Sequence, residues 1–192
     1  VRPFGHEFSF GSLVALTGVI GFVGLVVPQG LVPVQAGPRT AGVPPTRFDY
    51  ASPAVHFASS GQSAALPPGT QDELSVVLQL GAWLAGDARR FEPGQAFELP
   101  IAGSDAVQPS RWLVDGAETI TALGGQSVQA FKLTRLPLGG QGATASARLE
   151  VWLAEAMDYL PARLHWSWPD GTSVDAVVNT ARLNRTDSAA AT

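Results

Sequence analysis

The histidines and the carboxylates near them are the first residues in this chain that could carry out acid–base or metal chemistry. The chain has three histidines, His6, His56 and His165, and their separations do not match the spacing of metal ligands. His165 and Asp175 could form a general base and the carboxylate that orients it. The alternating pattern of the two strands also explains them as a pair on a solvent-facing surface, and this is the interpretation we favour.

Other catalytic patterns are missing from the sequence. Asp72 and Glu73 are adjacent carboxylates, but the capping of a helix explains both of them. The chain contains no nucleophile elbow, phosphate loop or dinucleotide-binding fingerprint, and it has no cysteine. We therefore expect a non-catalytic protein without a metal or a cofactor. The alternative enzyme is a hydrolase with a site assembled from distant residues, for instance around Arg148 and Glu150.

Large apolar side chains suggest a different kind of site, one for an apolar ligand. Trp166 and Trp168 share one face of a predicted strand with Leu164, and a predicted helix carries a nearly continuous apolar surface. An ordinary hydrophobic core explains the same pattern. The candidate ligand-binding residues are Leu74, Val77, Leu78, Trp83, Leu164, Trp166 and Trp168.

A helix over Thr70–Gly86 must position four of these seven residues. Thr70 and Glu73 have the spacing of a capping box, and apolar residues then recur with the 3.6-residue period of a helix. Gly86 could adopt the left-handed conformation that ends many helices. Burying five large side chains, at about 1.5–3 kcal/mol each, does not offset the backbone entropy of such a helix. A sheet must therefore cover it.

Short alternating segments after the helix predict that sheet. We expect a strand over Gln95–Ile101, a hairpin turning at Asp115-Gly116, and a turn at Gly124-Gly125. In Arg148–Leu153 the apolar residues alternate most regularly. The predicted fold class is mainly β (α+β), with a curved antiparallel sheet or half-open barrel wrapped around the one helix.

The last hairpin has a register that can be predicted from its faces. A three-residue loop, Pro169-Asp170-Gly171, pairs Trp166 with Val174 and keeps one face apolar. A two-residue loop would instead place Trp166 opposite Asp175. We therefore expect the three-residue loop, which also sets His165 opposite Asp175.

The first 35 residues allow three interpretations. Phe8–Val27 has no charged residue, so it could form buried strands, a signal peptide or a membrane span. Its glycines favour strands over a helix and so argue against a membrane span. With either buried strands or a signal-like segment at its start, residues 1–181 form one β-rich domain, and residues 182–192 form a disordered tail. A net charge of −4 with scattered basic residues argues against nucleic acid as a partner.

Three segments resemble a known bacterial family. The segments are Leu66–Leu80 (LPPGTQDELSVVLQL), Val128–Arg135 (VQAFKLTR), and Glu150–Ala154 followed by Asp158–Arg163 and the Pro169-Asp170-Gly171 turn. They resemble the bacterial domain-of-unknown-function 3108 family, with a looser likeness over Gln29–Phe57. The Pro137–Ser146 loop departs from the family, where we expect a more charged hairpin.

The resemblance implies an exported protein of the periplasm or cell envelope, and an amino-terminally shortened member of the family. It brings no catalytic residues, and its layout is similar to the half-open barrels of periplasmic lipoprotein carriers. Our leading hypothesis is a non-catalytic envelope protein that shelters a lipid, an acyl chain or another apolar small molecule. The alternative is a structural module that docks to an envelope protein.

Overall fold

The computed structural model describes the backbone of residues 6–8, 13–15, 18–27, 30–38, 44–136 and 147–179, and the side chains of residues 31–37, 44–89, 91–136 and 147–179. The first half of this chain contains β1 (His6–Phe8), β2 (Leu13–Ala15), β3 (Gly18–Val27), β4 (Gly30–Pro38), β5 (Thr46–Asp49), β6 (Ala54–His56), β7 (Ser63–Ala65), β8 (Gln71–Asp72), the helix α1 (Ser75–Asp87) and the 3-10 turn η1 (Ala88–Arg90). The second half contains β9 (Ala96–Ala102), β10 (Val107–Ala122), β11 (Gln126–Arg135), β12 (Arg148–Ala154), the 3-10 turn η2 (Glu155–Met157), β13 (Leu160–Ser167) and β14 (Ser173–Val177).

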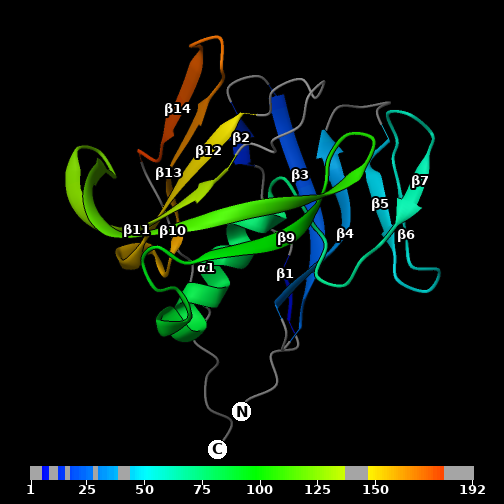
Figure 1. Ribbon diagram of the computed structural model, residues 1–192, viewed down its shortest axis with the longest axis horizontal. Coiled ribbons are helices and arrows are strands. Elements are labelled where there is room, and N and C mark those ends of the chain that lie inside the picture. The colour runs from blue at the N-terminus through cyan, green and yellow to red at the C-terminus, as the bar shows by residue number, and fades with distance from the viewer. Residues whose placement is uncertain are drawn as a thin grey trace, which may run out of the picture.

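These strands form two sheets of seven strands each within the described residues. The first sheet runs β1-β3-β4-β5-β6-β7, with β2 also paired to β3, and the second runs from β14 through β13, β12, β11, β10 and β9 to β8. All pairs are antiparallel except β8 with β9. The second sheet curls strongly into a half-barrel (Figure 1), and this confirms the predicted mainly β fold with one helix.

Helix α1 lies between the two sheets and contacts β4 on one side and β13 on the other (Figure 1). Leu80 and Leu84 are almost fully buried in the core of the second sheet, together with Trp112 and Leu133. Leu78 in the helix and Leu74 just before it pack against the hydrophobic core of the first sheet. A helix covered on two sides needs apolar residues around most of its circumference, and that is the pattern the sequence shows.

The predicted start of the helix is wrong, and so is the predicted role of Gly86 at its end. The helix begins at Ser75, because Gln71 and Asp72 add to the second sheet as β8. The Asp72 carboxylate accepts from the amides of Leu74 and Ser75, at 2.8 and 3.1 Å, and takes the role that we assigned to Thr70. The hydroxyl of Thr70 donates to the Pro67 carbonyl instead. Gly86 stays helical rather than ending the helix, since the chain continues from Asp87 into η1.

Gly81 lets the helix approach the second sheet closely. A Cβ atom at this position would collide with the backbone carbonyl of Tyr159, in the turn between η2 and β13. A Cβ atom at Gly86, in the same helix, would meet nothing within 4 Å. The position of the helix on the concave face of the half-barrel therefore depends on one glycine.

The hairpin predicted at Asp115-Gly116 does not exist, because β10 runs through it as one strand of 16 residues. The pairing with β11 shifts between Val114 and Gly116, which makes Asp115 a β-bulge. Gly116 has a φ of 111°, a conformation that favours glycine, and Pro93 packs against its open side. An Asp-Gly pair can thus bend a strand as well as turn it.

The register of the last hairpin is confirmed. Trp166 pairs with Val174, Leu164 with Ala176 and His165 with Asp175. The amide of Trp168 donates to the Thr172 carbonyl at 2.9 Å, which closes the three-residue loop, and Gly171 has a φ of 85°. The strand predicted over Gln95–Ile101, the turn at Gly124-Gly125 and the buried face of β12 are confirmed as well.

The amino-terminal segment forms strands where it is described. β3 covers Gly18–Val27, the second half of the uncharged segment Phe8–Val27. The side chains of β3 are not among those that the structure describes. Among the described residues, no helix is both long enough and apolar enough to cross a membrane. The predictions for the Pro137–Ser146 loop and for the tail over residues 182–192 lie outside the described residues.

Candidate functional site

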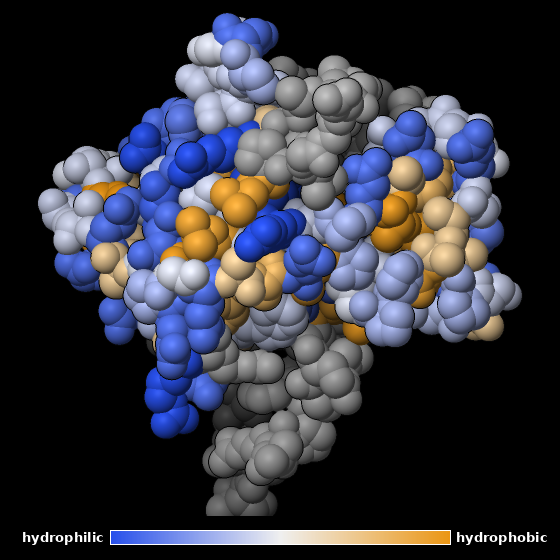
Figure 2. Space-filling view, viewed as in Figure 1, coloured by the Kyte–Doolittle hydropathy of each residue, from blue (hydrophilic) through white to orange (hydrophobic). Residues whose placement is uncertain are grey.

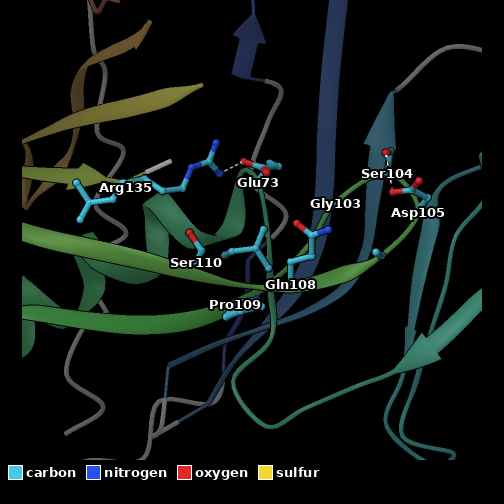
Figure 3. Close-up of a pocket in the computed structure, with 11 residues that line it drawn as sticks. Glu73, Gly103, Ser104, Asp105, Gln108, Pro109, Ser110 and Arg135 are labelled. Atoms are coloured by element: carbon cyan, nitrogen blue, oxygen red, sulfur yellow. Dashed lines mark hydrogen bonds and ion pairs between the residues drawn. The ribbon is translucent and has the colours of Figure 1, made fainter. Parts of the chain in front are cut away.

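A cleft of about 280 Å³ opens at the end of the half-barrel where the helix begins (Figure 3). The β9–β10 hairpin forms its floor, and the segment before α1 and the end of β11 form its sides. Its walls are Glu73, Ile101, Gly103, Ser104, Asp105, Ala106, Gln108, Pro109, Ser110, Arg135 and Leu136.

The cleft lies on the concave face of the second sheet because of the alternation of β10 and β11. Trp112 faces the helix, and Ser110 and Gln108 follow on the same face at steps of two residues. Arg135 pairs with Trp112 across β11 and points the same way. The helix covers Trp112 but does not extend as far as Ser110, and the cleft lies there.

Arg135 carries the positive charge of the cleft. Its Nη1 atom pairs with the Oε2 atom of Glu73, from the segment that enters the helix, and Figure 3 shows the two side chains reaching toward each other. The Arg135 side chain is 14% exposed, whereas that of Glu73 is 53% exposed. The guanidinium is therefore fixed against the sheet, while its partner extends into solvent.

Ser110 brings a buried hydroxyl to the cleft that has no partner. The residue is 5% exposed, and its Oγ atom makes no hydrogen bond in the described structure. The indole Nε1 of Trp112, the next residue on this face, is also buried without a partner. An unpaired buried donor costs about 1–3 kcal/mol, so two of them beside one arginine require an explanation.

The turn between β9 and β10 closes the other end of the cleft. The amide of Gly103 donates to the Ala106 carbonyl at 2.9 Å, and the Ser104 hydroxyl lies 3.3 Å from a carboxylate oxygen of Asp105. The hydroxyl of Ser59, from the first sheet's β6–β7 loop, donates to the Ser104 carbonyl. This turn is thus tied to both sheets, and in Figure 3 Asp105 lies at the end opposite Arg135.

A second group of charged residues occupies the opposite face of the same sheet. Glu150 accepts from Lys132 at 2.8 Å and from Arg148 at 3.2 Å, and it pairs with the Nδ1 atom of His165 at 2.9 Å. Burial alone would raise the pKa of the Glu150 carboxyl, but the bonds from Lys132 and His165 and the charges of Lys132 and Arg148 lower it to about 2. A carboxylate with this pKa is a poor general base near neutral pH.

Trp152 extends this group along β12. Lys132 and Arg163 lie over its ring, at 4.9 and 4.7 Å from the centroid, and its indole N–H donates to Glu118. Arg163 also forms a two-bond pair with Asp175, at 2.7 and 2.8 Å. His165 and Asp175 therefore face each other as predicted, but each bonds to a different neighbour.

A third polar group joins the helix to the first sheet. The side chains of Gln79 and Gln71 bind the amide and the carbonyl of Leu31 in β4, and so replace a neighbouring strand. Burial raises the pKa of Asp72 beside them, against the lowering effect of its bonds from Ser75 and Leu74. These bonds are structural, since they satisfy backbone groups of two elements.

The structure separates the predicted ligand-binding residues instead of gathering them. Val77 and Leu164 are buried in the core of the second sheet, with Trp83 and Trp166 packed against that core. Leu74 and Leu78 pack on the first sheet, and Trp168 is 37% exposed on the last hairpin. None of the seven lines the cleft.

The sequence held one signal for the cleft that our interpretation missed. Phe131, Leu133 and Arg135 follow each other at steps of two, so a cation continues the apolar face of β11. We named Arg135 only as part of the Val128–Arg135 segment, without using this alternation, and we assigned Glu73 to the cap of the helix. Ser110 has no distinctive sequence signal.

Comparison with protein families, with characterised proteins and with solved structures finds no match to this chain. The resemblance to the domain-of-unknown-function 3108 family therefore stays a prediction.

Proposed function

We propose that the chain is a non-catalytic protein of the cell envelope that binds a small amphipathic molecule in the cleft at the open end of its half-barrel. The observation that carries this proposal is Ser110, a buried and unpartnered hydroxyl that lines a solvent-accessible cleft beside an arginine. Binding sites combine apolar walls with a few polar groups that a ligand can satisfy.

Binding fits the cleft better than catalysis does. A serine nucleophile needs an adjacent base, and the hydroxyl of Ser110 has no hydrogen-bond partner in the described structure. Glu73 is occupied by Arg135, and the histidine of the sheet, His165, lies on the opposite face with Glu150.

The apolar part of the ligand would lie against the walls of the cleft rather than between helix and sheet. Leu80, Trp112 and Leu133 fill the space between α1 and the second sheet and are fully buried. Ile101, Pro109 and Leu136 give the cleft an apolar surface that a short hydrocarbon chain can cover. Figure 2 shows that, on the face in view, hydrophobic side chains lie in separate groups bordered by hydrophilic ones.

The envelope location rests on the resemblance of the sequence, which supports export. A binding protein of this kind would carry or sense a molecule with one polar end in the periplasm. Its ligand-binding role can be tested independently of its location.

The test is calorimetric titration with octyl compounds that differ in their polar end, namely octanoate, methyl octanoate, octylamine and octyl phosphate. We expect at least one of them to bind, and the substitution Ala106→Trp, which fills the cleft, to abolish its binding. Thr121→Trp, at an exposed site of β10 outside the cleft, is the control and should bind as the wild type does. Absence of binding by all four compounds, or binding unaffected by Ala106→Trp, would contradict the proposal.

A further inference from the structure

We infer that the ligand's polar end is a carboxylate, which pairs with Arg135 and accepts a hydrogen bond from Ser110. This inference rests on the proposed function and names the chemical class of the ligand. Three polar side chains of the concave face line the cleft, and they are the guanidinium of Arg135, the hydroxyl of Ser110 and the amide of Gln108. All three can donate a hydrogen bond, and the guanidinium can only donate. A set of donors selects a ligand end that is rich in acceptors.

Arg135 has the bonding capacity for a second carboxylate. Its planar guanidinium offers five N–H donors, and the pair with Glu73 involves Nη1. The arginine is held in place by its burial at the end of β11, so that little side-chain freedom is lost when a ligand binds. A carboxylate beside it could accept two parallel bonds, the arrangement that arginine favours.

Glu73 occupies the place of the ligand when the cleft is empty. Its side chain is more than half exposed, and its contact with Arg135 is an ion pair near the surface, which contributes little to stability. It can turn to solvent without leaving a buried charge. Glu73 therefore competes with the ligand, and its removal should strengthen binding.

Among anionic ligands, the charges of the cleft favour one negative charge over two. Glu73 and Asp105 both line the cleft, against the single positive charge of Arg135. A phosphate monoester, with nearly two negative charges at neutral pH, meets more repulsion there than a carboxylate does. The geometry thus favours a monocarboxylate on a short apolar chain.

The experiment measures the dissociation constants of octanoate, methyl octanoate and octyl phosphate for the wild type, Arg135→Gln, Glu73→Gln and the control Arg111→Gln. Arg111 is an exposed residue of β10 that does not line the cleft. We expect octanoate to bind at least tenfold more tightly than the ester and the phosphate. Arg135→Gln should weaken the binding of octanoate by about 10- to 100-fold, because a charged hydrogen bond is lost, and should leave the affinity for the ester unchanged.

The variant Glu73→Gln tests whether Glu73 competes with the ligand or only forms a structural ion pair with Arg135. We expect it to tighten octanoate binding several-fold, and Arg111→Gln to have no effect. Equal affinity for octanoate and its ester in all four proteins would overturn the carboxylate while leaving the binding function intact. Binding of octyl phosphate alone, or an unchanged octanoate affinity in Glu73→Gln, would also contradict the inference.

Discussion

The two faces of the second sheet hold their charged groups in opposite ways. On the outer face, Glu150 has three partners, and Trp152 lies between two cations with its N–H bonded to Glu118. On the concave face, Arg135 has a partner that is mostly exposed, and Ser110 has none. One sheet therefore carries a complete polar network on one face and an incomplete one on the other.

This difference separates groups that stabilise the fold from groups that await a ligand. In the outer network each charged side chain has a partner of opposite charge or a hydrogen-bond partner, and its members hold neighbouring strands together. An incomplete one costs free energy that a bound molecule can recover. Charged clusters are common on sheets, so the unpartnered donor is a better indication of a binding site than the number of charges.

The largest loss of stability should follow a substitution on the outer face. Trp152→Ala removes a buried ring from a cluster that includes Met157 and Ala162, and we expect a loss of about 3–5 kcal/mol in the free energy of unfolding. Chemical denaturation measures it. The control Trp152→Phe keeps a ring but not the bond to Glu118 and should lose less. A loss below about 1 kcal/mol for Trp152→Ala would mean that the outer face does not stabilise the sheet.

On the concave face, a substitution in the helix away from the cleft should also lower stability. Gly81→Ala places a methyl group against the Tyr159 carbonyl, and we expect it to lower the free energy of unfolding by about 1–3 kcal/mol. Gly86→Ala is the matched control, since its Cβ meets no atom within 4 Å, and it should raise stability by about 0.5–1 kcal/mol. If both variants behave alike, the close approach of helix and turn is not what fixes the helix.

The outer network should also make stability depend on pH in acid. The pKa of Glu150 is about 2 in the folded protein, below its ordinary value of 4.5, so its contribution is present above pH 4.5 and is lost as the pH falls toward 2. Because the carboxylate is partly exposed, we expect its contribution to the free energy of unfolding to be about 1 kcal/mol. Denaturation at pH 6 and pH 2.5 should show the wild type losing that much more than Glu150→Gln. Equal losses in the two proteins would show that the network is not coupled to folding.

The sequence was informative where one residue's neighbours decide its structure. The alternation of Leu149, Val151 and Leu153 predicts a buried strand face, and the apolar face of Trp166 fixes the register of the last hairpin. The Asp115 bulge could not be predicted, since Asp-Gly suits a turn and a bulge equally, and the choice depends on the pairing with β11.

The cleft could not be predicted from the sequence, for a similar reason. It exists because the helix begins five residues later than its capping pattern suggests, once Gln71 and Asp72 have joined the second sheet as β8. This shift leaves a cleft beside Ser110 and Arg135 on the concave face. Such a boundary depends on contacts between distant segments, which no local pattern encodes.

The smallest effects should distinguish the two faces most directly, through two buried hydroxyls. Thr134 donates from its Oγ1 atom to Asp115 at 2.7 Å, whereas Ser110 has no partner. We expect Thr134→Val to lower the free energy of unfolding by about 1 kcal/mol, and Ser110→Ala to leave it unchanged or raise it slightly. Thermal denaturation without ligand measures both. If Ser110→Ala costs as much as Thr134→Val, the hydroxyl of Ser110 serves the fold, and the contrast between the two faces is lost.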